Sequence, residues 1–517
     1  MNIFTKIFYN KSFWFLFLLG LNLAMGQMPV DLPYSAYCSL VALGFFWTKY
    51  QPMGSEALVW GLGFGFGYFG PTFFWIIEPF LVAPEKTGWL APLALVCLVA
   101  ILSLILSICF YLASRFGSGS SKNKKVVLLF LFFLLSELIR SELVFDFPWG
   151  LISSMWINTP LSQSLALFGP YWLSAFTIFS AFLLSRFWLG SIVGFSILIA
   201  LYSFGQARLH TDLIERLNPI KVRIVQPNIR QSEKWRPELA SEFLSKHIDL
   251  SKSSKENGVD IIVWPETAIS YEIQNKNLRN RISIDLDTEL VLGVRRLDIE
   301  NNKLFNSAIM LAKNGNILNT YDKIKLVPFG EYIPFGQFLA NMQIFGLAVD
   351  GLIGFSSGTS KYYFNTDKLG IFKILICYEA IFSQHMLRST QRPSWIIHIT
   401  NDAWFGAFNG PQQHLALTRM RAIEQGLPIV RSANTGISAM IGPYGRIHSK
   451  LDLGNTAYID EILPSALEPT PYYLMGPKLC NLLLLTGLLL TIVSLIIIKW
   501  IKKFIKKNGI NENGKNF

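Results

Sequence analysis

Long apolar runs crowd the first 205 residues of the chain and return once near its end, and they constrain the fold more than any other feature of the sequence. Of the 517 residues, 51% are hydrophobic and only 15% are charged, which is too apolar for an ordinary soluble protein of this length. A helix of about 20 apolar residues crosses a bilayer. We therefore expect a membrane protein.

Eight segments are long and apolar enough to predict transmembrane helices, at residues 12–25, 34–48, 56–77, 88–113, 126–143, 164–185, 187–205 and 479–498. The stretch between the last two has ordinary soluble composition. We therefore predict four parts in chain order: a polytopic α-helical membrane domain (1–205, about seven helices), a soluble domain (206–478), a transmembrane helix (479–498) and a basic tail (499–517). As an alternative for the first segment, "KSFWFLFLLGLNLAMG" has the features of a cleaved signal peptide.

Basic residues indicate the orientation, because cytoplasmic loops retain Lys and Arg. If every predicted helix crosses, one side of the membrane carries Lys6, Lys11, Lys49, Arg115, Lys122, Lys124, Lys125, Arg186, Lys499, Lys502, Lys503, Lys506 and Lys507. Residues 206–478 then lie outside the cytoplasm, so we expect an exported domain. These loops also account for much of the net charge of +12, so we expect a membrane surface rather than nucleic acid as the partner.

Two features of the membrane part resemble functional motifs. "GLGFGFGYFG" has the G-x-G-x-x-G spacing of a dinucleotide loop, but it lies inside a predicted helix, where Gly63 and Gly67 favour close helix packing instead. Glu137 and Arg140 are ionisable residues at membrane depth, three positions apart on one helix. We predict that they form an ion pair, with the lining of a lipid cavity as the alternative.

From residue 221 onward, short β-runs alternate with amphipathic helices. The predicted strands include "KVRIVQPN", "VDIIVWPE", "KLGIFKILICYE", "SWIIHITNDAWFG" and "LPIVRSANTG", and "QQHLALTRMRAIEQG" is a predicted helix. Strands that are apolar on both faces and interleaved with helices favour a layered α/β fold with covered sheets. In such folds functional groups gather where strands end.

Three of these predicted groups make a nucleophile site. Cys377 closes "KILI" and is the lone cysteine of the predicted exported domain, which favours a free thiol with a chemical task. A thiol needs a base to deprotonate it and a cation to stabilise developing charge. Glu266, after "IIVWP", is the candidate base and later the acid. Lys323, in "YDKIKLVPFGEYIPF", is the candidate cation beside the tetrahedral oxyanion.

The histidines give weaker alternatives. They have no paired metal-ligand spacing, so we expect no metal and no cofactor. His398 alternates within an apolar strand, which is typical of a core residue. A Cys–His pair formed with His385 or His414 is the remaining alternative for activating the thiol.

The motifs "VWPE", "YDKIKLVPFGEYIP", "ICYE" and "NDAWFG" resemble those of the carbon–nitrogen hydrolase (nitrilase) superfamily. Together with the eight predicted helices, the chain resembles the bacterial apolipoprotein N-acyltransferases over nearly its full length. The resemblance implies a nitrilase-like αββα sandwich on a membrane base and a Glu266, Lys323 and Cys377 triad. It also implies a location in the bacterial inner membrane, with the domain at 206–478 on the periplasmic side. It also implies supporting roles, which fall on Glu331, Tyr378, Glu379 and Trp235.

The reaction implied is transfer of the sn-1 acyl chain of a phospholipid such as phosphatidylethanolamine, through a Cys377 thioester, to the α-amine of a diacylglyceryl-cysteine at a lipoprotein N-terminus. A membrane-tethered amidase that uses the same triad with water as acceptor is the alternative. The apolar stretch 341–355 is a candidate lid that dips into the membrane, with a loop packed on the core as the alternative. Trp404 is expected to line the same entrance.

Overall fold

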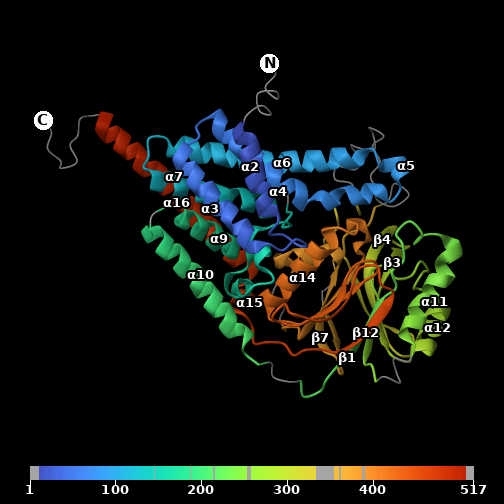
Figure 1. Ribbon diagram of the computed structural model, residues 1–517. Helices are drawn as coiled ribbons and strands as arrows, with labels where there is room; N and C mark the ends of the chain where they lie inside the picture. Colours follow the sequence, from blue (N-terminus) through green and yellow to red (C-terminus); the bar gives the residue numbers. More distant parts are fainter. Residues whose placement is uncertain are drawn as a thin grey trace.

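The computed structural model describes residues 11–144, 146–186, 188–212, 216–252, 258–332, 354–359, 363–386 and 391–507. Figure 1 shows two parts side by side: a group of long helices, and a strand-rich part that contacts it along one face. The last helix of the chain, α16, returns to the helical group, so the strand-rich part is inserted between two helical segments.

Each of the eight predicted apolar segments is helical. The helices are α2 (Lys11–Ala24), α3 (Pro33–Tyr50), α4 (Ser55–Thr72), α6 (Leu90–Gly117), α7 (Lys122–Leu138), α9 (Pro170–Leu184), α10 (Trp188–Leu209) and α16 (Pro477–Lys507). Within the described residues, α6, α10 and the Pro477–Lys502 stretch of α16 are long and apolar enough to cross a membrane by themselves, whereas α2 and α9 are apolar but shorter. Eight crossings remain a prediction.

Two predicted helices end earlier than expected and continue as short irregular segments, and a third is broken near its start. α4 stops at Thr72 beside Pro71 and is followed by the 3-10 helix η1 (Phe74–Leu81). α7 continues as the π-helical turn η2 (Ile139–Leu143). The predicted segment 164–185 is broken at Gly169, where φ is 86° and α9 begins one residue later. These breaks lie near the strand-rich part and shape the surface that contacts it.

The glycine motif packs helices together, as predicted. A Cβ atom on Gly67 of α4 would lie 2.0 Å from the carbonyl oxygen of Phe17 in α2, and one on Gly63 would lie 2.5 Å from that of Phe13. Since only glycine avoids these clashes, the two backbones can approach closely. Gly67 of the G-x-G-x-x-G pattern and the nearby Gly63 therefore belong to a helix–helix contact.

The predicted ion pair between Glu137 and Arg140 is wrong, because no such pair occurs among the described residues. Glu137 instead accepts a 2.6 Å hydrogen bond from Ser174. Arg140 donates to the carbonyl oxygens of Trp149 (2.7 Å) and Gly150 (2.5 Å). The guanidinium has several donors, and nearby backbone oxygens satisfy them where the helix ends. Arg140 thereby fixes the loop that carries Trp149.

The strand-rich part is built from two six-stranded sheets. One has the order β12-β1-β2-β3-β4-β5, with strands β1 (Lys221–Gln226), β2 (Ile261–Val263), β3 (Glu289–Asp298), β4 (Lys303–Leu311), β5 (Ile317–Asp322) and β12 (Ala457–Ile462). The other has the order β11-β10-β9-β8-β7-β6, with strands β6 (Tyr363–Thr366), β7 (Gly370–Ile376), β8 (Trp395–Thr400), β9 (Ile429–Ala433), β10 (Ser438–Ile441) and β11 (Ile447–Leu451). The central strands β1 to β3 and β7 to β9 run parallel, with antiparallel strands at both edges.

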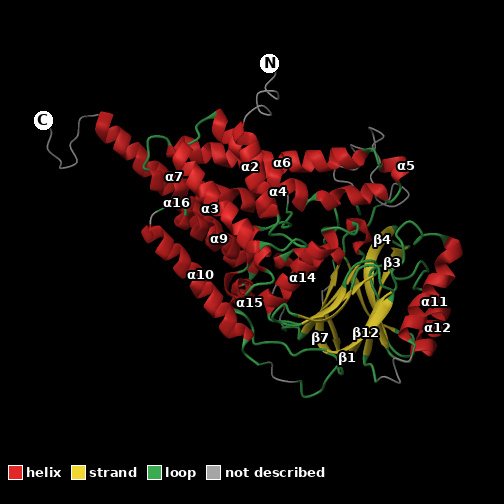
Figure 2. Ribbon diagram, viewed as in Figure 1, coloured by secondary structure: helices red, strands yellow, loops and turns green. Residues whose placement is uncertain are grey.

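Three apolar layers confirm the predicted sandwich. The inner layer joins the two sheets through side chains such as Ile224, Val263, Ile374, Ile376 and Ile397. The outer layers join one sheet to α11 (Ala240–Ser251) and α12 (Lys276–Leu286), and the other sheet to α14 (Gly410–Gln425). Strand residues that are buried on both faces require these helical covers. Figure 2 shows the strands between α14 on one side and α11 with α12 on the other.

Candidate active site

The backbone makes a sharp turn at Cys377, where β7 passes directly into the 3-10 helix η6 (Cys377–Ile381). Its φ angle is 49°, in the left-handed region that residues with a Cβ atom rarely adopt. The side chain is only 5% exposed. A strained strand-to-helix turn is a common way to present a nucleophile above the end of a sheet. The strand end was predicted from the sequence, whereas the φ angle was not.

Glu266 and Lys323 follow two strands of the same sheet. Glu266 follows β2, and Lys323 follows β5 directly. The Nζ atom of Lys323 lies 3.7 Å from Oε1 of Glu266, and both side chains are buried. The charges of both groups act on the thiol of Cys377. The structure thus brings together the three residues that the sequence selected, from three strand ends.

The electrostatics of these groups determine their resting states. Burial raises the pKa of the Cys377 thiol well above its usual value; the negative charge of Glu266 raises it further, and Lys323 only partly opposes this. The thiol is therefore protonated at neutral pH and needs a base. Burial lowers the pKa of Lys323, but the carboxylates of Glu331 and Glu266 outweigh that effect and raise it above its usual value. Lys323 therefore keeps its charge.

Glu331 completes a buried network with Lys323 and Asn306. The Lys323 Nζ atom donates to Oε1 of Glu331 at 2.9 Å. Asn306 in β4 donates from Nδ2 to Oε1 of Glu266 at 2.7 Å and to Oε1 of Glu331 at 2.9 Å. Asn306 was not selected from the sequence. The available signal was a buried amide within the otherwise apolar strand "FNSAIML", since such a group must find partners.

A second buried lysine lies beside this network. Lys234 is 3% exposed and donates a 3.1 Å hydrogen bond to the backbone oxygen of Glu266. Burial lowers the pKa of Lys234 to about 8, although the charges of Glu266 and Cys377 oppose the shift. The adjacent Trp235, predicted on the substrate side, is 38% exposed, and the Arg295 guanidinium lies 3.6 Å from its ring centre. Sequence reasoning selected the tryptophan and missed the lysine.

Glu379 is enclosed and acts as a clamp. Its Oε1 atom accepts hydrogen bonds from the hydroxyl of Tyr321 (2.7 Å) and the N–H groups of Ile324 (2.8 Å) and Lys325 (3.2 Å). Its Oε2 atom accepts from the N–H of Ile376 at 2.9 Å. Glu379 therefore joins the turn at the nucleophile to the loop that follows Lys323.

The remaining predicted residues lie around this centre. Tyr378 is 7% exposed, with its ring edge-on to Phe382 at 5.0 Å. Trp404, in η8 (Asp402–Phe405), is half-buried against the core. Most of the candidate lid, residues 341–353, lies outside the described residues.

Aromatic residues of the membrane part contact the α/β part next to the candidate active site. The indole N–H of Trp149 donates to Oε1 of Gln413 at 2.6 Å, and its ring stacks on His414 at 5.7 Å between centroids. Trp75 and Phe405 complete this aromatic cluster. The first turns of α14 are therefore held against the helical group.

A cavity of about 410 Å³ opens where η1 of the membrane part meets four segments of the α/β part. Its lining includes Glu78, Arg230, Gln231, Ala403 and Gly406. Gly406 lies so close to Glu78 that a Cβ atom there would be 2.3 Å from the carboxyl carbon. Both parts of the chain therefore form its wall.

Comparison with known proteins follows the same division of the chain. Residues 19–183 match the model of the apolipoprotein N-acyltransferase N-terminal domain, and residues 221–472 match that of the carbon–nitrogen hydrolases. Among solved structures, an amidase of the nitrilase superfamily from Nesterenkonia sp. AN1 is 16% identical, with a TM-score of 0.36; the match covers 49% of this chain and 94% of the amidase.

Full-length relatives are more similar. The apolipoprotein N-acyltransferase of Rhodopseudomonas palustris is 34% identical over 443 residues, which cover 80% of this chain and 82% of the relative. That of Brucella suis is 35% identical over 432 residues, covering 79% and 80%. With both domain models matched in order and relatives aligned across both parts, this membrane protein belongs to the apolipoprotein N-acyltransferase family, acyltransferases of the carbon–nitrogen hydrolase superfamily.

Proposed function

We propose that the chain transfers the sn-1 acyl chain of a phospholipid, such as phosphatidylethanolamine, to the α-amine of an N-terminal diacylglyceryl-cysteine of a lipoprotein. The observation that carries this proposal is the buried group of Glu266, Lys323 and Cys377 at three strand ends. Family membership supports the lipid substrates, and the geometry supports the roles of the residues.

In the first step, Glu266 takes the proton of the Cys377 thiol as sulfur attacks the ester carbonyl carbon. The tetrahedral oxyanion is stabilised by the Lys323 ammonium and by the backbone N–H of Tyr378. As the intermediate collapses, the C–O bond breaks and the leaving lysophospholipid oxygen takes the proton from Glu266. The acyl group is then a thioester on Cys377.

In the second step, the amine of the lipoprotein cysteine attacks the thioester carbonyl and gives a proton to Glu266. The C–S bond breaks, the sulfur of Cys377 recovers the proton, and the N-acylated lipoprotein leaves. Glu331 and Asn306 hold Lys323 and Glu266 in place through both steps. Glu379 holds the nucleophile turn, and Trp235 and Trp404 lie where substrate chains approach.

The division of the chain is part of the same proposal. Residues 1–205 and 479–498 anchor the enzyme in the inner membrane, residues 206–478 work at its periplasmic face, and 499–517 form a cytoplasmic tail. Moving acyl chains into water costs about 0.8 kcal/mol per methylene, so a site beside the bilayer avoids that cost. Thiol labelling of cysteines introduced in the exposed loops of 206–478 tests this orientation, and labelling from the cytoplasm alone would refute it.

The mechanism is tested with purified enzyme in defined phospholipid. Mass spectrometry is expected to find one acyl chain on Cys377 of the wild type and none on Cys377→Ala or Cys377→Ser. A diacylglyceryl peptide added next should accept the chain as an amide. Release of free fatty acid without N-acylation would instead favour the amidase alternative, and acyl on another residue would show that the nucleophile assignment is wrong.

A further inference from the structure

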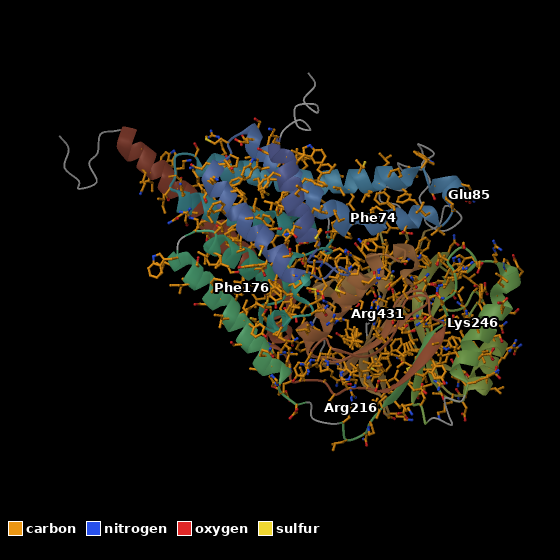
Figure 3. The ribbon with its side chains drawn as sticks, viewed as in Figure 1. Phe74, Glu85, Phe176, Arg216, Lys246 and Arg431 are labelled. Carbon is orange, nitrogen blue, oxygen red and sulfur yellow. The ribbon has the colours of Figure 1, made fainter. Side chains whose placement is uncertain are left out.

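A fully buried polar cluster lies behind the nucleophile. His398 of β8 and His414 of α14 both direct Nε2 toward the backbone oxygen of Cys377, at 3.1 and 3.3 Å. Arg431 of β9 donates to Nδ1 of His398 at 2.9 Å and to Oδ2 of Asp402 at 2.5 Å. Arg431, labelled in Figure 3, lies inside the α/β part, and neither it nor the other cluster members is exposed.

The partners of His398 determine where its proton lies. A guanidinium can only donate, so Nδ1 of His398 must accept from Arg431. Burial, and after it the charge of Arg431, lower the pKa of His398 well below its usual value, so the ring is neutral. The single ring proton is therefore on Nε2, and His398 donates a hydrogen bond to the Cys377 oxygen.

His414 has a different role in the cluster. Its Nδ1 atom lies 2.9 Å from Oδ1 of Asp402, so this nitrogen donates to the carboxylate. Its Nε2 atom lies 3.3 Å from the Cys377 oxygen, and an Arg431 nitrogen lies 3.3 Å from its Nδ1 atom. Its ring stands edge-on to that of His398 at 5.2 Å between centroids. His414 therefore packs beside His398 at the same oxygen, and His398 makes the shorter contact with it.

The oxygen that His398 holds belongs to the same peptide group as the N–H of Tyr378. A peptide group is planar and its C=O and N–H point in opposite directions, so fixing the oxygen also fixes the N–H. Tyr378 is the second residue of η6, where an N–H has no acceptor within the helix. A hydrogen bond to the oxygen also polarises the group and strengthens the N–H as a donor.

We propose that His398 is a positioning residue that aims the Tyr378 N–H at the oxyanion of the acyl-transfer reaction, with His414, Arg431 and Asp402 as its supports. The hydrogen bond from His398 also holds the carbonyl oxygen of Cys377, whose backbone is left-handed. This inference rests on the proposed acyl transfer, because attack of Cys377 on the ester carbonyl supplies the oxyanion.

Two variants of similar size distinguish the roles of the two ring nitrogens of His398. In His398→Gln, the side-chain amide reaches the place of Nε2 and can still donate to the Cys377 oxygen. In His398→Asn, the shorter amide reaches only the place of Nδ1, so the bond to the oxygen is lost. Both variants remove the imidazole from the same buried position, which controls for general damage to the core.

Two reactions of Cys377 distinguish the positioning of the Tyr378 N–H from the reactivity of the thiol. Acylation by phospholipid passes through an oxyanion, whereas alkylation by iodoacetamide displaces iodide and forms none. Both are followed at Cys377 by peptide mass spectrometry on the full-length enzyme in detergent. We expect His398→Asn to lower the acylation rate at least tenfold with alkylation within twofold of wild type, and His398→Gln to recover most of the acylation rate.

Each other outcome has a defined meaning. Equal acylation rates in the Asn variant and wild type would overturn the role of His398. Acylation and alkylation that fall together, or equal losses in the Asn and Gln variants, would assign His398 a structural role instead. If wild type itself formed no acyl-Cys377, the proposed function would fail and this inference with it.

Discussion

The side-chain amide of Asn306 donates a 2.7 Å hydrogen bond to Oε1 of Glu266. The same nitrogen donates to Glu331, so one uncharged group holds two carboxylates beside Lys323. Because the amide adds no charge, Glu266 remains available to take a proton while its position is fixed.

Replacing Asn306 by aspartate should change the pH dependence of acylation. A third carboxylate next to Glu266 and Glu331 favours protonation of one of them, which raises the pH at which Glu266 can act as a base. The acid limb of the pH–rate profile for acyl-Cys377 formation should therefore move to higher pH. Asn306→Leu is the matched control: it should lower the rate without moving the limb. An unmoved acid limb in Asn306→Asp would contradict the role of this contact.

Glu379→Gln should destabilise the nucleophile turn and slow acylation. On one side, the NH₂ group of Gln would face an N–H donor, so buried donors would be left without an acceptor. An unsatisfied buried group of this kind costs about 1–3 kcal/mol. In a domain of this size that corresponds to about 2–4 °C in melting temperature per kcal/mol. Tyr321→Phe removes only one of the four hydrogen bonds and should cost less. Thermal unfolding in detergent measures both, and an equal loss in the two variants would argue against the clamp.

Lys234 should produce a basic limb in the same pH–rate profile. Since burial lowers its pKa to about 8, its positive charge near Glu266 and Cys377 disappears as the pH rises through that value. Acylation in wild type should fall above about pH 8. Lys234→Met should be slower at neutral pH and lack this limb, whereas Lys234→Arg keeps its charge and should lose only the limb. A limb that persists in Lys234→Met would assign it to another group.

Glu424 on α14 should make stability depend on pH. Burial raises its pKa to about 7 despite the 2.6 Å ion pair with Arg421. Between its unfolded value near 4.5 and about 7, the folded state binds more protons than the unfolded state, so stability falls as the pH rises. The slope from this group is at most about 1.4 kcal/mol per pH unit.

Glu424→Gln should therefore lose less stability than wild type between pH 5 and pH 7.5. The melting temperatures of both proteins across this range provide the measurement. Parallel curves would mean that Glu424 titrates at its ordinary pKa. Ser383→Ala, which removes only a 3.4 Å contact to the same carboxylate, serves as the control.

The sequence already determined the elements and most of the site. The apolar runs located eight helices because their length and composition leave few alternatives. The doubly apolar strands indicated covered sheets. The edge strands β5, β6, β11 and β12 and the four-residue strand β10 were missed because they are short or half-exposed. Cys377, Glu266 and Lys323 were found because each is a reactive group directly after a strand or in a motif loop.

Contacts between residues that lie far apart in the sequence were decided only by the tertiary structure. Glu137 and Arg140 share a helix, yet each binds a different segment, because backbone oxygens and Ser174 offered better geometry than the neighbouring charge. His398 looked like an ordinary core residue, since its alternation revealed burial but not its contact with the Cys377 oxygen. The periodicity of a sequence predicts which side chains are buried, whereas tertiary packing decides which polar atoms they contact.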